Sequence, residues 1–420
     1  DKKDWSALLQ RPGLKLHELE EQVQSIIQDV AARGDRAVKQ YTLEFDGFDG
    51  ESLEVNAEEI GAAVKEISPG LKKAIEEAYW NIQTFHKKQL HAQEMVVTTA
   101  GVRCWQKPVP ISKVGLYIPG GSAPLLSTVL MLGIPARIAG CEQVVLCTPP
   151  DTEGKVSPSI LYIASLLGID RVFKVGGVQA IAAMAHGTES VPKVHKIFGP
   201  GNQYVTMAKQ VVSRDTVAID MPAGPSELAV LADSRANPSF IASDLLSQAE
   251  HGPDSQVLLF TDSAKLIDQV EAEIQTQLAL LPRKDIASKA LDNSKMILLK
   301  NQDEMMSMVN EYAPEHLIIM TENYTQLADQ VINAGSVFLG DYSPESAGDY
   351  ASGTNHTLPT NGWAHAHSGV NMDSFYKKIT FQEISRYGLH NIGGAIMTLA
   401  EAEELQAHSN AVSVRLKHEE

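Results

Sequence analysis

A short segment near the middle of the chain places three side chains suited to metal binding or proton transfer within four positions. It reads LLSQAEHG and contains Gln248, Glu250 and His251. On a helix Gln248 and His251 share one face, whereas Glu250 points elsewhere. The Gly-Pro pair that follows ends the helix, so we expect Gln248 and His251 at a helix end beside a loop. The alternative is a polar helix end whose imidazole only caps backbone carbonyls.

Three more clusters combine carboxylates or amides with imidazoles. They are Glu315 with His316, Asp349 with Asn355 and His356, and Glu403 with His408. Pro314 breaks the preceding helix, so Glu315 and His316 are expected to open a strand from a loop. A carboxylate beside an imidazole is an acid/base pair near neutral pH, although a solvated Glu-His dipeptide is the alternative. The stretch 341–359 around Asp349 has no apolar periodicity and is interpreted as a long functional loop.

Imidazoles combined with carboxylate and amide oxygens suit zinc or a similar divalent ion. Ligand chemistry alone nominates His251, Asp349 and one of His316, His356 or His408. It does not nominate Gln248, because amides are uncommon zinc ligands. The three cysteines have no CxxC spacing, which opposes a disulfide framework or a cysteine-rich zinc site.

Composition excludes several classes of protein. With 44% hydrophobic and 21% charged residues among 420, the chain has the balance of a globular protein of two to three domains, which excludes fibrous and disordered classes. The net charge of −17 opposes nucleic-acid binding and is compatible with a small cationic substrate. An uncharged run at 114–136 is broken by prolines, so a membrane span is not expected. We expect a cytoplasmic protein, or one in an organelle stroma after removal of a transit peptide.

Hydrophobic periodicity predicts an α/β protein. Residues 1–112 are expected to form a helical N-terminal region that packs on the second of two lobes. Alternating β-rich and helical stretches then predict a first α/β lobe at 113–226 and a second at 227–369, each with a parallel sheet. Residues 370–420 are expected to form a helical tail with little core of its own, which must pack on the body or on another subunit.

Glycines gather where the strands of the first lobe are expected to end. In open α/β sheets ligands bind at the carboxyl ends of strands, and glycine there lets a backbone approach a phosphate closely. No GxGxxG fingerprint follows these strands, so the glycines indicate either a nucleotide site or tight turns.

Together these motifs resemble the histidinol dehydrogenase family. The resemblance rests on IDMPAGPSE at 219–227, DLLSQAEH at 244–251, YIPGG at 117–121, FGPGN at 198–202, APEHL at 313–317, GTNH at 353–356 and LQAH at 405–408. It extends over nearly the whole chain. It implies two incomplete Rossmann-like lobes with small swapped segments, and an enzyme of histidine biosynthesis that oxidises L-histidinol through L-histidinaldehyde to L-histidine with two NAD+.

The resemblance also implies roles for individual residues. Zinc, one ion per subunit, is expected on Gln248, His251, Asp349 and His408, the last from the partner subunit of a homodimer. Glu315 and His316 are the expected catalytic residues. Substrate contacts fall to Ser226, Gln248, His251, His316, Asp349, His356, Glu403 and His408. NAD contacts fall to Tyr117, Gln179 and Asn202. The first lobe is thereby expected to bind NAD, the second to carry the zinc and catalytic residues, and the tail to complete the partner's site.

Three other functions remain open on the residues alone. A dehydrogenase of the same fold acting on another amino or sulfonated alcohol would not need both Glu403 and His408. A non-catalytic metal- or nucleotide-binding protein would leave the Glu315-His316 couple without a purpose. A hydrolytic metalloenzyme would leave the glycine-tipped strands of the first lobe without a ligand. Neither nucleic acid nor a membrane is expected as a partner.

Overall fold

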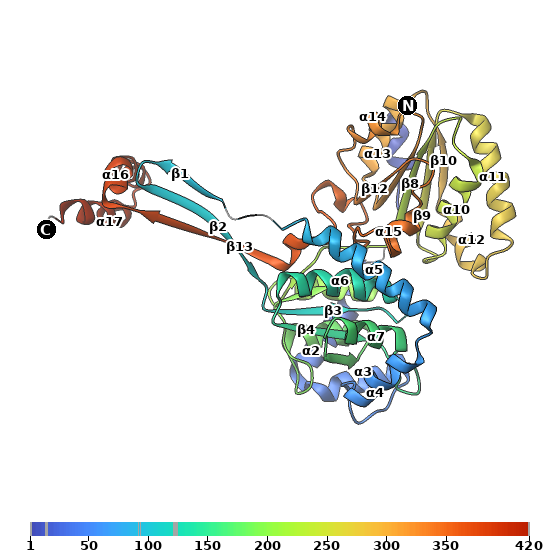
Figure 1. Cartoon of the computed structure of the whole chain (residues 1–420), viewed down its shortest axis with the longest axis horizontal. Helices are drawn as coiled ribbons and strands as arrows, with labels where there is room; N and C mark the ends of the chain where they lie inside the picture. Colours follow the sequence, from blue (N-terminus) through green and yellow to red (C-terminus); the bar gives the residue numbers. More distant parts are fainter. Residues whose placement is uncertain (1, 13–15, 91, 93, 121–124, 419–420) are drawn as a thin grey trace. The chain divides into compact units, whose positions relative to one another are not determined.

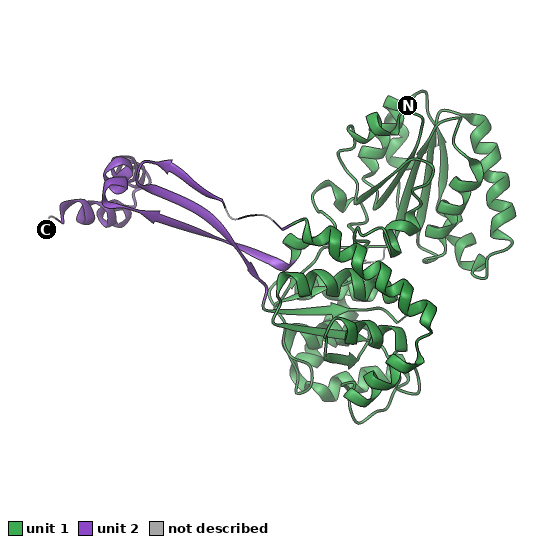
Figure 2. Cartoon of the chain, in the orientation of Figure 1, with its two compact units in different colours: residues 1–89, 112–374 green, residues 90–111, 375–420 purple. Residues whose placement is uncertain are grey.

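The chain forms two compact units (Figure 2). Unit 1 comprises Asp1–Gln89 and Ser112–Ser374, and unit 2 comprises Leu90–Ile111 and Phe375–Glu420. The structure, a computed structural model, describes residues 2–12, 16–90, 92, 94–120 and 125–418. Unit 1 holds two parallel sheets, and unit 2 holds one antiparallel sheet.

The first lobe of unit 1 is built on a five-stranded parallel sheet (Figure 1). Its strands are β3 (Lys113–Tyr117), β4 (Gln143–Thr148), β5 (Arg171–Lys174), β6 (Lys196–Phe198) and β7 (Ala218–Ile219). They lie in the order β5-β4-β3-β6-β7. The connecting helices are α6 (Leu126–Ala139), α7 (Pro158–Leu166), α8 (Gly177–His186) and α9 (Gln203–Val212). The strands are mostly buried, as expected for a parallel sheet covered on both faces.

The second lobe repeats this plan. Its strands are β8 (Glu227–Ala232), β9 (Gln256–Thr261), β10 (Lys295–Leu298), β11 (His316–Met320) and β12 (Ser336–Leu339). Its helices are α10 (Pro238–Ala249), α11 (Ala264–Leu278), α12 (Lys284–Asp292), α13 (Gln302–Tyr312), α14 (Tyr324–Ala328) and α15 (Glu345–Tyr350). A short 3₁₀ turn, Trp363–His365, follows. The strand order β10-β9-β8-β11-β12 is the same as in the first lobe.

The shared strand order confirms the predicted α/β class with incomplete Rossmann-like lobes. Numbered within its own lobe, each sheet has the order 3-2-1-4-5, which is the Rossmann order without its sixth strand. The order reverses between β3 and β6 in one lobe and between β8 and β11 in the other. Ligand sites of such folds lie next to this reversal.

The N-terminal helices correct one prediction. α2 (Leu16–Arg33) and α3 (Asp35–Asp46) pack on α8 of the first lobe, and α4 (Ala57–Glu66) packs on α7. The prediction that the region packs on the second lobe is therefore wrong for these helices. An apolar stripe on a helix predicts that this face is buried, but it does not show which of the two lobes buries it.

Two other N-terminal elements do reach the second lobe. α1 (Trp5–Leu8), which follows the short 3₁₀ turn Lys2–Asp4, contributes Trp5 to the second-lobe core. α5 (Pro69–Lys87) lies on α6 of the first lobe, and its Asn81 donates a hydrogen bond to the carbonyl of Ala351 at 2.8 Å.

Unit 2 is a three-stranded antiparallel sheet with two helices. β2 (Val102–Pro110) pairs with both β1 (Met95–Thr99) and β13 (Tyr376–Ile384), and α16 (Arg386–Ala402) and α17 (Gln406–Lys417) pack on each other. The 3₁₀ turn Met372–Phe375 precedes β13. The predictions of a helical region up to residue 112 and of a helical tail are wrong for these strands. The β13 segment is rich in β-branched and aromatic residues, which favours a strand once a partner is available.

The uncharged run at 114–136 is part of the first-lobe interior. It comprises β3 and most of α6, a helix that is buried over nearly its whole length. Gly121 and Pro124, which interrupt the run in the sequence, lie outside the described residues. Among the helices that the structure describes, none combines the length and the apolar character needed to cross a membrane.

Ile27 tests the placement of α2 on the first lobe. Its side chain is 5% exposed and lies in the first-lobe core. We expect Ile27→Ala to lower the free energy of unfolding of this lobe by about 2–4 kcal/mol, because the substitution removes buried methyl groups and leaves a cavity. Urea denaturation measures the change. The matched control is Gln28→Ala on the exposed face of α2, which should change stability by about 0.5 kcal/mol or less. If Ile27→Ala lowered the free energy of unfolding by no more than Gln28→Ala does, this packing would be contradicted.

Candidate active site

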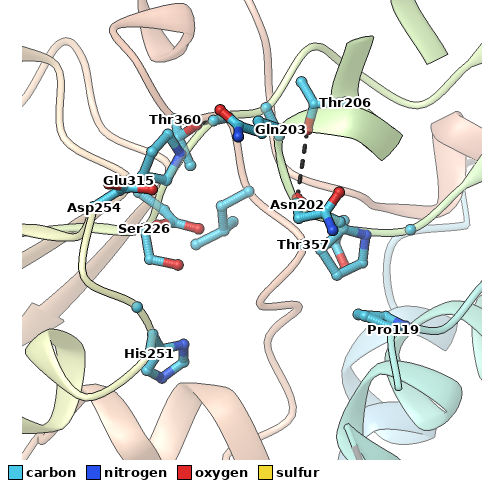
Figure 3. A pocket seen from close by; sticks show the side chains of 18 of the residues that line it. Pro119, Asn202, Gln203, Thr206, Ser226, His251, Asp254, Glu315, Thr357 and Thr360 are labelled. Carbon is cyan, nitrogen blue, oxygen red and sulfur yellow. Dashed lines mark hydrogen bonds between the residues drawn. The ribbon is translucent and has the colours of Figure 1, made fainter. Parts of the chain in front are cut away.

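A cavity of about 450 Å³ in unit 1 is lined by residues of both lobes. Figure 3 shows Ser226, His251 and Glu315 on one side of it and Pro119, Asn202 and Thr206 on the other. The first lobe faces the cavity with loops that follow the carboxyl ends of its strands, as predicted. The second lobe faces it with residues at the amino ends of β8 and β11. The second lobe thus departs from the general rule that ligands of open α/β sheets bind at the carboxyl ends of strands.

Glu315 and His316 open β11 from a loop, as predicted. Ala313 ends α13 in the left-handed conformation, with φ of 50°, and Pro314 separates it from the strand. Both side chains bind the backbone of Glu227 on the neighbouring strand. The Glu227 N–H donates to Glu315 Oε2 at 2.9 Å, and His316 Nδ1 lies 3.3 Å from the Glu227 carbonyl oxygen.

This contact fixes the tautomer of His316. A carbonyl oxygen can only accept, so Nδ1 carries the proton and Nε2 keeps a free lone pair. Burial lowers the pKa of His316 to about 4, although the Asp349 carboxylate opposes the shift. The imidazole is therefore neutral at neutral pH. Its Nε2 has no hydrogen-bond partner within the described part of the chain and lies 3.7 Å from Asp349 Oδ1.

Glu315 is buried beside other carboxylates. Burial raises its pKa well above the ordinary value, the hydrogen bond from the Glu227 N–H opposes this, and the Glu227 and Asp349 carboxylates raise it further. A carboxylate in such surroundings is a stronger base than one in water. Glu315 and His316 therefore form an acid/base couple, of which Glu315 lines the cavity.

A buried ion pair anchors Glu227. Arg11 donates to Glu227 Oε1 at 2.5 Å and to Oε2 at 3.0 Å, and the Glu227 side chain is only 4% exposed. Arg11 also donates to the carbonyl of Tyr312 at 2.6 Å and lies 4.0 Å from the centre of its ring. The Asn361 N–H donates to Glu227 Oε1 at 2.8 Å. Sequence reasoning gave neither Arg11 nor Glu227 a role, because the two are 216 positions apart, and Glu227, although it ends the IDMPAGPSE motif, binds the site through its backbone.

The end of α10 and helix α15 bring together a group suited to a metal ion. His251, Glu345 and Asp349 each offer a ligand atom, and these atoms lie within 4.8 Å of one another. Gln248, fully buried near the end of α10, lies next to Glu345. Three of the four predicted zinc ligands, Gln248, His251 and Asp349, are therefore brought together. The predicted loop 341–359 contains α15, so its interpretation as a loop throughout is wrong.

Glu345 is the member of this group that sequence reasoning missed. It lies one helical turn before Asp349 on α15, so both carboxylates share a face. This spacing of four was the only signal in the sequence. It was hidden because a six-residue helix is too short to show hydrophobic periodicity.

Ser226 and His356 also line the cavity. His356 Nε2 lies 3.2 Å from Ser127 Oγ on α6, and burial lowers the pKa of His356. A neutral imidazole here accepts or donates a hydrogen bond without adding charge next to the metal-binding group.

The predicted NAD contacts divide into two places. Asn202 lines the cavity and caps α9, with its Oδ1 accepting from the N–H groups of Tyr204 and Val205 at 3.1 Å. Tyr117 ends β3, and its hydroxyl accepts from the Gly177 N–H at 3.1 Å. Gln179 on α8 is fully buried, and neither atom of its amide has a hydrogen-bond partner among the residues described.

The loop before Asn202 is held by a buried ion pair. Lys209 Nζ lies 2.5 Å from Asp220 Oδ1 and donates to the Gly199 carbonyl at 2.8 Å, while Asp220 Oδ2 accepts from the Gly199 N–H at 2.8 Å. Gly199 has φ of 127°, and a side chain there would collide with the carbonyl of Tyr117. The glycine-rich turn is thus a fixed part of the cavity wall.

Similarity to known proteins identifies the family. The sequence matches the histidinol dehydrogenase family over residues 9–416. The chain belongs to the histidinol dehydrogenase family. A histidinol dehydrogenase of Bacteroides thetaiotaomicron is 61% identical over 415 residues, which cover 99% of this chain and 97% of that protein. The Escherichia coli K12 histidinol dehydrogenase is 53% identical over 412 residues, 97% of this chain and 94% of its own. The crystal structure of histidinol dehydrogenase from Elizabethkingia anophelis matches with a TM-score of 0.97 at 53% identity, covering 99% of this chain and 96% of that one.

Membership in the histidinol dehydrogenase family makes the protein an oxidoreductase and confirms the resemblance stated from its motifs. The family implies NAD and a metal, and the group formed by His251, Glu345 and Asp349 is a possible metal site.

Two residues predicted for the histidinol dehydrogenase site lie in unit 2. Glu403 directly follows α16, and His408 lies in the first turn of α17. Both are exposed in this single chain, and Glu404 between them has φ of 59°. The left-handed residue sets the sharp turn between α16 and α17, with Glu403 just before it and His408 in the helix that follows.

Arg11→Met tests the anchor of Glu227. The substitution keeps an apolar stem but leaves a buried carboxylate without its cation, so we expect a loss of about 3–5 kcal/mol in the free energy of unfolding. It should also lower kcat, because the Glu227 backbone binds both Glu315 and His316.

Urea denaturation and steady-state kinetics measure the two effects of Arg11→Met. The control is Arg103→Met, which removes an exposed pair with Glu383 and should cost about 1 kcal/mol or less. Adding Glu227→Gln to Arg11→Met should recover part of the stability. Equal stability of the Arg11 and Arg103 variants would show that the anchor contributes nothing.

Proposed function

We propose that this protein is a zinc-dependent L-histidinol dehydrogenase. It oxidises L-histidinol through L-histidinaldehyde to L-histidine and reduces two NAD+, the final steps of histidine biosynthesis. The observation that carries the proposal is the neutral His316, whose free Nε2 faces Asp349 of the metal-binding group while Nδ1 is held by a backbone carbonyl. An acid/base pair beside a metal site and a cavity shared by two lobes suits oxidation of a small alcohol.

Zinc is proposed on Gln248, His251 and Asp349, with His408 of the partner subunit as the fourth ligand and one ion per subunit. One imidazole and one carboxylate already converge beside the amide, and the described unit 1 residues offer no thiolate at this place, so the donor set fits zinc or a similar divalent ion. When bound, the ion supplies orientation, since it can hold the amine and imidazole nitrogens of the substrate.

The first oxidation uses His316 as the base. Its neutral imidazole accepts the hydroxyl proton of histidinol at Nε2 while the alcohol carbon loses hydride to the nicotinamide, which gives the aldehyde. The Glu227 carbonyl holds the Nδ1–H and stabilises the imidazolium that forms. The carbon therefore loses two electrons with its hydride, and the proton remains on His316 until solvent removes it.

The second oxidation begins with Glu315. Its carboxylate removes a proton from water as the water oxygen bonds to the aldehyde carbon, and the former carbonyl oxygen takes up a proton from solvent, which gives the hydrate. His316 then accepts a hydroxyl proton of the hydrate while its carbon loses hydride to a second NAD+, which gives the carboxylate of histidine after loss of a further proton. Burial of Glu315 excludes bulk water and raises its pKa, and both favour transfer of a proton from one held water.

Substrate contacts are proposed for Ser226, Gln248, His251, His316, Asp349 and His356 of one subunit with Glu403 and His408. Glu403 pairs with a cationic or hydrogen-bonding group of histidinol. Ser226, His251 and His356 line the cavity, which supports their part of the set.

NAD is proposed to contact Tyr117, Gln179 and Asn202. The unpaired amide of Gln179 supports contact with a polar ligand, because a buried amide without hydrogen-bond partners costs free energy. Asn202 caps α9, and the amino end of a helix favours the phosphates of a dinucleotide.

A homodimer with shared sites is proposed on the basis of the apolar surface of unit 2. Unit 2 exposes large apolar side chains on its strands and helices, among them Val97, Phe381, Tyr387 and Leu399. Such groups are usually covered by another surface. His408 on this unit then completes the metal site of the partner subunit.

Product stoichiometry tests the proposed reaction. With zinc and histidinol the protein should form two NADH for each histidinol consumed, measured by absorbance and by analysis of the histidine formed. Glu315→Gln should slow oxidation of histidinaldehyde at least 10-fold more than oxidation of histidinol, because only the second step needs an activated water.

The matched control for Glu315→Gln is Glu311→Gln, an exposed carboxylate on α13 that should leave both rates unchanged. One NADH for each substrate, with aldehyde accumulating in the unmodified protein, would refute the four-electron reaction.

Mixed dimers test the shared site. His251→Ala and His408→Ala should each inactivate the homodimer, but co-expression of the two variants should restore roughly a quarter of the activity, because random pairing gives half heterodimers with one intact site each. Activity of the purified mixture measures this. The control mixture, His251→Ala with Gln248→Ala, alters the same half of the site and should stay inactive. Equal inactivity of both mixtures would show that His408 serves its own subunit.

A further inference from the structure

Helices α10 and α15 are joined by a cluster of buried polar side chains next to the metal-binding group. Asp244, Ser247 and Gln248 lie on one face of α10, at spacings of three and four residues. Opposite this face lies the first residue of α15, Glu345, whose side chain is 1% exposed. The two helices are in contact.

Hydrogen bonds between these helices run in both directions. The backbone N–H of Glu345 donates to the Asp244 carboxylate. The Glu345 carboxylate has Ser247 and Gln248 as hydrogen-bond neighbours. The start of α15 is therefore tied to the last two turns of α10 through both its backbone and its side chain.

The amide of Gln248 has one orientation compatible with Glu345. When Glu345 is ionised, as beside a bound cation, its carboxylate only accepts, so the amide nitrogen must face it, and Nε2 then donates to Glu345 Oε2 at 3.0 Å and also to Oε1. The opposite orientation would place the amide oxygen against two acceptor oxygens. The carboxylate therefore determines that the oxygen, and not the nitrogen, is the free atom of this amide.

We propose that Glu345 is a positioning residue that orients Gln248 as an oxygen ligand of the metal ion. This inference rests on the proposed zinc site. An amide is a weak ligand with two nearly equivalent orientations, and a carboxylate acceptor on its nitrogen both fixes the orientation and increases the electron density on the oxygen. Glu345 thus explains how a residue type that ligand chemistry disfavours can serve in this site.

Glu345 is also placed to set the other side chains of the site. It shares a helix face with Asp349, one turn later, and its Oε1 lies 3.8 Å from His316 Nδ1. Glu345 lies within reach of His251 as well, so it could instead be a direct ligand. With the amide nitrogen turned toward Glu345, Gln248 donates to the oxygens of that carboxylate, which favours the positioning role. The two roles predict different results when Gln248 is absent.

Zinc affinity of the metal-free protein tests the inference. The full chain is stripped of metal and titrated with Zn²⁺ against a chromophoric chelator, so that the readout does not depend on activity. We expect Glu345→Gln to weaken Zn²⁺ binding about 10–100-fold, as for other partners of metal ligands. In the Gln248→Ala background the same substitution should cost about 3-fold or less, because the residue it orients is gone.

Other results overturn the inference. Glu345→Gln with the affinity of the unmodified protein would show that Glu345 has no role at the metal. An equal loss in both backgrounds would make Glu345 a ligand in its own right. Glu58→Gln, at an exposed carboxylate in the first turn of α4, is the control and should leave the affinity unchanged.

Two further measurements keep the inference testable. Circular dichroism and the thermal midpoint of each metal-free variant show whether it is folded. If Glu345→Gln does not fold, Glu345→Asp replaces it, since it keeps the charge but withdraws the acceptor from Gln248, and it should show the same dependence on Gln248. Absence of Zn²⁺ binding by the unmodified protein would refute the proposed zinc site itself, whereas tight binding with no effect at Glu345 refutes only the positioning role.

Discussion

The Arg11–Glu227 ion pair is the interaction on which the rest of the site depends. A buried carboxylate is stable only with a partner. Arg11 makes a bidentate contact with the Glu227 carboxylate, and its guanidinium lies over the Tyr312 ring. Once Glu227 is fixed at the start of β8, its backbone N–H and carbonyl bind Glu315 and His316 on the next strand. The N-terminal segment, far from the cavity in sequence, thereby sets the acid/base couple.

The two lobes face the cavity with opposite electrostatic character. The first lobe presents the capped amino end of α9, where partial positive charge favours phosphates. The second lobe presents the carboxyl end of α10, where partial negative charge favours a cation, and the metal-binding group gathers there. Two sheets of identical strand order are thus used in different ways. One suits an anionic cofactor, and the other suits a metal ion and an amine.

Local sequence patterns predicted the side chains whose positions depend on where a helix ends or a strand begins. The Gly-Pro stop after His251 and the proline before Glu315 each placed their residues correctly, at a helix end and at a strand start. The partners of those residues were not predictable in this way. Glu227 acts through its backbone, Arg11 acts across 216 positions, and α15 is too short to show a period. For the same reason, the stripe on α2 indicated burial without showing that the first lobe buries it.

The antiparallel sheet of unit 2 imposes an order on folding during synthesis, because its strands lie far apart in the sequence. β2 precedes the strands of both parallel sheets in the sequence and β13 follows them, and the pair Arg103–Glu383 joins positions 280 residues apart. β2 therefore emerges from the ribosome long before the strand that covers it. The strands of unit 1 can form while β2 is still without that partner, and pairing with β13 closes a loop of 280 residues between Arg103 and Glu383. Unit 2 is thus the last part to be completed, and a chain cut short before β13 would keep only its strands β1 and β2.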